Sequence, residues 1–109
     1  YIYQVPTRMF TAVAIQDGVY DNLPLSNPRA LAVGPDGARY IADTDNHRIQ
    51  KFTGEGAFLS KWGSWGNGNA QFAYPGGVAV DGNGAVYVSS YSNTDYYVIF
   101  YTSRIQKFT

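Results

Sequence analysis

The chain contains no cysteine, a single histidine and few charged residues. Without cysteine it has no disulfides, no thiol catalysis and no zinc site built from thiolates. Charged residues make up 15% of its 109 residues and sum to a net charge of zero, so the basic face that nucleic-acid binding needs is not expected. No apolar run approaches the roughly 18 residues that suggest a membrane-spanning helix.

Apolar and turn-forming residues are abundant. Hydrophobic residues make up 45% of the chain and aromatic residues 17%, with 12 glycines and 10 tyrosines. This balance favours a packed core of strands and turns over a disordered chain. The chain begins at Tyr1 without a signal-peptide pattern, which indicates a processed chain or a fragment. The lack of cysteine leaves the compartment open, and we expect an extracellular or cell-surface location.

Two motifs recur along the chain. The sequence PRALAV at Pro28–Val33 is echoed by PGGVAV at Pro75–Val80, 47 positions later. The sequence RIQKFT occurs at Arg48–Thr53 and again at Arg104–Thr109, 56 positions later. The two offsets differ by nine residues, so the second repeat carries a nine-residue insertion, which we place in the tyrosine-rich stretch Asp95–Tyr101. Repeats of this length are typical of solenoids and propellers.

Each repeat reads as a series of short strands. Apolar or alternating runs separated by Pro-Asp-Gly, Gly-Glu-Gly and polar turns predict four strands, at residues 30–33, 38–42, 48–53 and 57–62. Four strands at a spacing of about ten residues form one antiparallel blade. No segment has a helical period, so essentially no helix is expected.

The stretch Asn27–Ser90 resembles an NHL repeat. The resemblance rests on Asn27-Pro28, Asp36-Gly37, the Asn46-His47 pair and the strand Arg48–Phe52. It implies a β-propeller blade, usually one of six in a closed ring, and an interaction platform. We therefore predict an all-β fold, a partial β-propeller of about two four-stranded antiparallel blades of NHL type.

The second repeat departs from the family pattern. Ser89-Ser90-Tyr91 replaces the usual small residue followed by Asp, and the insertion interrupts the turn before the last strand. In the first repeat, Arg39 stands where an apolar residue is usual. The first blade is thus expected to be regular and the second remodelled.

The predicted organisation is a single propeller segment. Residues 1–26 are expected to end a preceding blade, residues 27–63 to form a complete NHL blade, and residues 64–109 to form a second blade with the aromatic insertion and no fourth strand. Repeat units need neighbours to bury both faces, and an open sheet edge recruits another chain. Three outcomes follow: three chains closing a six-bladed ring, copies adding into a filament, or a portion of a longer propeller.

No residue is predicted to be catalytic, cofactor-binding or metal-ligating, and no cofactor is expected. A single His47 cannot assemble a histidine metal site. The stretch Asp43–Asn46 lacks the glycine and distant glutamate of a calcium-binding EF-hand loop. Gly63–Gly68 does not match a phosphate-binding loop and no helix follows it. We therefore predict that the chain is not an enzyme.

Aromatic residues are the candidates for partner or assembly contact, because tyrosine and tryptophan dominate interface hot spots. These candidates are Trp62, Trp65, Tyr91, Tyr96, Tyr97, Phe100 and Tyr101. Packing of the insertion on its own sheet is the simpler alternative, and stacking on a small ligand or sugar is another.

The sequence favours a non-enzymatic protein-interaction or scaffold module that self-associates or belongs to a longer propeller. Its expected partner is protein, chiefly copies of itself, with no nucleic acid and no membrane span. One alternative is a structural subunit of an extracellular filament assembled through open sheet edges. Another is a fragment of a propeller lyase or lactonase, since some NHL-like propellers are enzymes.

Overall fold

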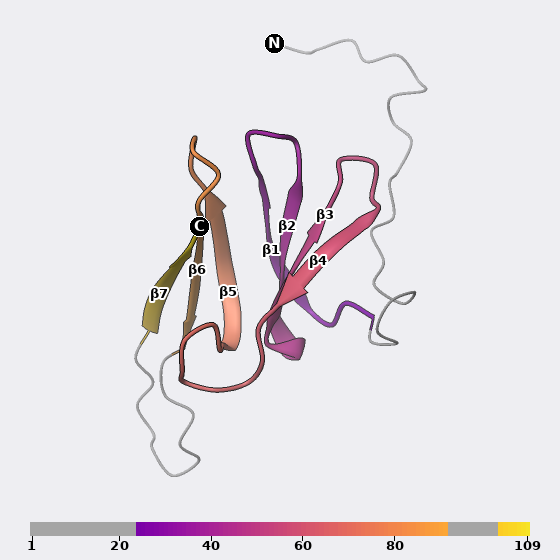
Figure 1. Cartoon of the computed structure of the whole chain (residues 1–109). Helices are drawn as coiled ribbons and strands as arrows, with labels where there is room; N and C mark the ends of the chain where they lie inside the picture. The colour runs from indigo at the N-terminus through magenta and orange to yellow at the C-terminus, as the bar shows by residue number, and fades with distance from the viewer. Residues whose placement is uncertain (1–23, 92–102) are drawn as a thin grey trace, which may run out of the picture.

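The computed structural model describes residues 24–91 and 103–109, which form two antiparallel sheets (Figure 1). The first blade, in the order β1-β2-β3-β4, comprises Pro28–Val33, Arg39–Asp43, Arg48–Phe52 and Phe58–Trp62. The second blade, in the order β5-β6-β7, comprises Ala73–Val80, Val86–Tyr91 and Ser103–Phe108. The predicted fold class, an all-β partial propeller, is confirmed. The division at residues 1–26, 27–63 and 64–109 stays a prediction, because much of the first segment lies outside the described residues.

The first hairpin of each blade turns in the same way. Gly37 and Gly84 both have φ of 87°, a conformation that glycine adopts without steric cost. Asp36 lies directly before Gly37, and its Oδ1 accepts from the Ala38 N–H at 3.0 Å. Asp81 lies three residues before Gly84, and its Oδ1 accepts from the Ala85 N–H at 3.0 Å. These local contacts explain why the turns could be predicted.

Among the described residues, a 3-10 turn, η2, at Thr44–Asn46 between β2 and β3 departs from the predicted all-strand structure. It ends at His47, whose φ of 53° is left-handed and whose N–H donates to the Thr44 carbonyl at 3.1 Å. Asparagine and aspartate favour such turns because their side chains bond to nearby backbone. In the described part of the chain, no helix has the length and apolar character needed to span a membrane.

The core lies between the two sheets. Strand β5 packs along β1 and β2 (Figure 1). The first blade contributes Ala42 and Ile49, both 0% exposed, and the second contributes Val86 and Val88. The linker supplies Phe72, whose ring is also fully buried. The blades therefore share one hydrophobic core, as adjacent propeller repeats do.

Candidate functional site

A buried carboxylate organises the loop end of the first blade. Asp43 is fully buried and accepts hydrogen bonds from Arg48 Nε at 2.7 Å, Asn46 Nδ2 at 3.0 Å and Gln50 Nε2 at 3.1 Å. Its other oxygen accepts from the Ser26 N–H at 2.7 Å. Because both oxygens are engaged by protein donors, this carboxylate acts as an internal crosslink of the blade.

The second blade uses the same Arg-Ile-Gln motif differently. Ser90 replaces the aspartate, and Arg104 Nη2 donates instead to the carbonyls of Gly68 and Gln71, at 2.7 and 2.8 Å. Gln106 donates to the Gln71 carbonyl at 2.8 Å and accepts from the Ala70 N–H at 2.9 Å. The motif thus bonds β7 to the linker between the blades, residues 63–72. Sequence reasoning missed this role, although a repeated Arg-Ile-Gln without its aspartate was the available signal.

His47 joins the two blades at the loop end. Its Nδ1 accepts a hydrogen bond from the Tyr74 N–H at 3.0 Å, and the Tyr74 ring lies edge-on to the imidazole with centroids 4.5 Å apart. Trp65 approaches the imidazole in the same way at 6.1 Å. The histidine is therefore part of the loop framework.

We expect stability to depend on pH through His47. Burial lowers the pKa of His47, and the carboxylate of Asp45 opposes that effect. A histidine whose pKa is lower in the folded state binds its proton more readily when unfolded, so stability is retained above pH 6.5 and falls as the pH drops below it. Protonation also removes the lone pair that accepts the Tyr74 N–H. Urea unfolding of wild type between pH 7.5 and 5 should show this loss.

The variant His47→Asn is the matched control for this pH dependence. Asparagine tolerates the left-handed conformation and retains a side-chain acceptor without titrating. Its stability should stay level across the same range. An equal loss in both proteins would contradict the assignment to His47. The pKa of Asp81 is also lowered, chiefly because its carboxylate accepts a hydrogen bond from the Ala85 N–H, so this group stays ionised throughout the range.

The structure separates the aromatic residues singled out by the sequence. Trp62 is half-buried, with its ring 5.4 Å from that of Phe108 and 6.3 Å from that of Tyr40, inside the junction between the blades. Trp65 and Tyr91 are 53% and 43% exposed. The remaining candidates lie outside the described residues: Tyr96, Tyr97, Phe100 and Tyr101. Contact with a partner stays a prediction for all seven.

The second blade has an open face. Ile49 and Ile105 occupy the same place in the repeated motif, yet Ile49 is 0% exposed in the junction and Ile105 is 71% exposed. Ile105 pairs with Ser89 across the sheet, and Tyr87 with Lys107 lies on the same face. On the first blade, Leu31 is 59% exposed. The chain therefore presents exposed apolar residues on both blades.

The described residues hold no group of three or more metal-ligating side chains of the His, Cys, Asp and Glu types. His47 is engaged with Tyr74, and Asp43 with its four donors. In Asp43–Asn46, the side chain of Asp43 is thus used in the internal hydrogen bonds of the blade.

Comparison with known proteins identifies the repeat. The NHL repeat family matches residues 25–52, which include β1, β2 and β3. Protein brain tumor of Drosophila melanogaster is 37% identical over 86 aligned residues, covering 76% of this chain and 8% of the fly protein. The chain thus spans only a small part of the length of that relative. Together with the two bladed sheets, these matches confirm the predicted resemblance: the chain belongs to the NHL-repeat β-propeller family.

Proposed function

We propose that this chain is a non-enzymatic protein-interaction module that binds copies of itself through the open faces of its blades. The observation that carries the proposal is the contrast between Ile49 and Ile105. The isoleucine at this position is buried between the blades in the first repeat and is 71% exposed in the second. An exposed apolar face of this kind marks an interaction site.

The occupant of the open face can be inferred from the junction inside the chain. There, Val78 and Val80 of β5 pack toward the first blade. Their counterparts 47 positions earlier are Leu31 and Val33, which are 59% and 53% exposed. The first blade of one chain can therefore pack on the second blade of another chain, which repeats the junction inside each chain. Such a contact joins two different surfaces, so copies add head to tail.

Head-to-tail association has two end states. If the rotation from one chain to the next brings the last chain back to the first, the product is a closed ring. If it does not, the product is an open filament. The open state corresponds to the structural-subunit alternative, and an extracellular or cell-surface location fits a cysteine-free, charge-poor chain. Electron microscopy of the assembled protein separates a ring from a fibre.

We expect Ile105→Asp to weaken self-association at least tenfold, because burying an unpaired carboxylate in the new junction is costly. Leu31→Asp should have the same effect from the opposite face. Light scattering across a concentration series measures both. Ala57→Asp adds the same charge at an exposed position beside the β3–β4 turn and should assemble like wild type.

Mixing the two variants tests the geometry. The Ile105→Asp protein keeps an intact Leu31 face, and the Leu31→Asp protein keeps an intact Ile105 face, so the mixture should form a dimer with one good junction. A symmetric contact, in which each face binds its own kind, gives no such rescue. A wild-type chain that stays monomeric and folded at all concentrations would contradict self-association.

A further inference from the structure

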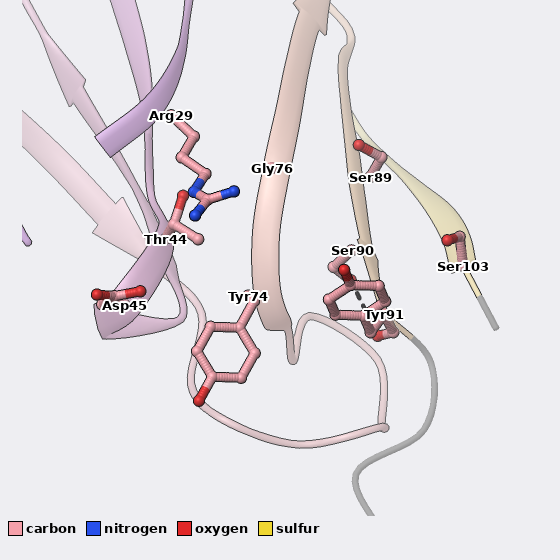
Figure 2. Close-up of a pocket in the computed structure, with 9 residues that line it drawn as sticks. All are labelled: Arg29, Thr44, Asp45, Tyr74, Gly76, Ser89, Ser90, Tyr91 and Ser103. Carbon is pink, nitrogen blue, oxygen red and sulfur yellow. Dashed lines mark hydrogen bonds between the residues drawn. The ribbon is translucent and has the colours of Figure 1, made fainter. Parts of the chain in front are cut away.

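A cavity of about 540 Å³ opens at the loop end of the junction between the blades. Figure 2 shows residues that line it, with Arg29 and Thr44 on one side of β5 and Ser89, Ser90 and Ser103 on the other. Tyr74 and Tyr91, at 49% and 43% exposed, stand at its rim. Its volume falls in the range of sites that bind small ligands or single side-chain groups of a partner.

The cavity exists because the second repeat has lost large side chains. At the equivalent places of the repeats, Gly76 replaces Arg29, Ser90 replaces Asp43 and Ser103 replaces His47. A Cβ atom added at Gly76 would meet nothing within 4 Å. The first repeat fills these positions with an arginine, an aspartate and a histidine, whereas the second leaves space lined by hydroxyl groups.

Arg29 supplies the charge of the cavity. Its side chain is exposed, and its guanidinium extends into the space between η2 and β5 (Figure 2). No hydrogen bond or ion pair joins it to another described residue. Asp45 also lines the cavity and adds a negative charge beside it; its carboxylate accepts from Asn27 Nδ2 at 3.4 Å. The donors of the Arg29 guanidinium thus face solvent, where a ligand that enters the cavity can accept from them.

We propose that this cavity binds an acidic side chain, aspartate or glutamate, of a partner protein. A planar guanidinium binds a carboxylate through two parallel hydrogen bonds, and the serine hydroxyls can bond to the flanking peptide backbone. The half-exposed tyrosines at the rim are the residue type that anchors protein interfaces. A free carboxylate alone would leave most of the volume unfilled.

The charge distribution argues against a nucleic acid as the occupant. Arg29 is the one cationic residue among those that line the cavity, and Asp45 stands beside it. Binding a phosphate backbone draws on several lysines and arginines at once. A single guanidinium among hydroxyl groups is matched better by a single carboxylate.

This inference rests on the proposed function, because it takes the chain to be a module that contacts protein. The cavity adjoins the open face of the second blade, since Ser89 lines the cavity and pairs with Ile105. The two proposals can still fail separately, because one is read from the preference between two peptides and the other from light scattering of the chain alone.

The test uses acetylated and amidated pentapeptides, Gly-Ser-Glu-Tyr-Gly and the isosteric Gly-Ser-Gln-Tyr-Gly, titrated against the chain by calorimetry. We expect the glutamate peptide to bind at least tenfold more tightly than the glutamine peptide. In Arg29→Gln this preference should disappear. In Gly76→Met, binding of both peptides should be lost, since the added side chain enters the cavity; the backbone accepts a side chain there, as Arg29 shows in the first repeat.

Arg39→Gln is the matched control, because it removes one positive charge at the opposite end of β2, where Arg39 bonds to the Gly37 carbonyl. It should keep the preference for glutamate. Circular dichroism and light scattering confirm that each variant folds and assembles like wild type, which keeps this test independent of self-association.

Four results would overturn the proposal. Equal binding of the two peptides would show that the carboxylate is not recognised. An unchanged preference for glutamate in Arg29→Gln would show that the guanidinium does not bind it. Glutarate binding as tightly as the glutamate peptide would make the ligand a free acid. Tighter binding of a single-stranded oligonucleotide, lost in Arg29→Gln, would assign the cavity to nucleic acid.

Discussion

Replacing Asp43 by alanine should lower the free energy of unfolding by about 3–5 kcal/mol, because it breaks a buried ion pair by removing one partner. Arg48 is 6% exposed, and its Nε lies 2.7 Å from the Asp43 carboxylate. Removal of the carboxylate also takes away one hydrogen-bond acceptor from each of Asn46, Gln50 and the Ser26 N–H. Small domains are stable by only about 5–15 kcal/mol, so this variant should lose a large share of its stability.

Urea denaturation followed by tryptophan fluorescence measures the effect, and the midpoint should fall by roughly 1–3 M. Asp45→Ala is the matched control, because Asp45 lies two residues away and is exposed. It should change stability by less than about 1 kcal/mol. A midpoint for Asp43→Ala within the error of the Asp45→Ala value would show that the crosslink adds nothing.

In the second blade Ser90 stands in the place of Asp43, so we expect the same substitution to have a smaller effect on stability there. Ser90→Ala removes a hydroxyl whose hydrogen bond, to the Tyr91 carbonyl at 3.3 Å, is local and long. It should cost far less than Asp43→Ala. The repeated Arg-Ile-Gln motif thus makes different contacts in the two blades: a buried ion pair with Asp43 in the first, and hydrogen bonds to the linker carbonyls in the second.

Local chemistry made the strands predictable. Residues 30–33, 38–42, 48–53 and 57–62 were expected as strands, and each lies within one or two residues of β1 to β4. The turns depend on aspartate and glycine a few positions apart, which the sequence displays directly. Because the sequence repeats, the same strand pattern could be predicted for the second blade.

Contacts between blades were harder to foresee. Trp62 was a candidate for partner contact, but its ring packs on Phe108, which is 46 residues later in the chain. The fastening of Gln71 by Arg104 and Gln106 joins segments more than 30 residues apart. Such pairings depend on how one sheet sits on the next, and a pattern of period two shows only which residues share a face.

The cavity could not be predicted from the sequence for the same reason. The departure at Ser89-Ser90-Tyr91 was visible in the sequence as a loss of the usual aspartate. Its consequence, a space facing Arg29 across β5, depends on the placement of β1 beside β5. Substitution by small residues produces a void only where no neighbour moves in to fill it.

Replacing Phe72 by alanine should be as damaging as replacing Asp43, at about 3–5 kcal/mol, because it empties the centre of the junction. Phe72 is 0% exposed, and its ring centroid lies 5.9 Å from that of Phe108. A Cβ added at Gly63 would come within 2.6 Å of the same ring, so the linker closes tightly around it. The cavity left behind would lie between the blades and weaken both.

Hydrogen exchange can show whether the junction makes the two blades a single folding unit. In Phe72→Ala, amide protection should fall in β3 of the first blade and β6 of the second by similar factors, since each blade buries its apolar face on the other. Leu59→Ala, at a position that is 50% exposed on β4, should change protection in neither by more than a small factor. Loss confined to β6, with β3 unaffected, would mean that the first blade is stable without its neighbour; the shared core would then hold the blades in place without being needed to fold them.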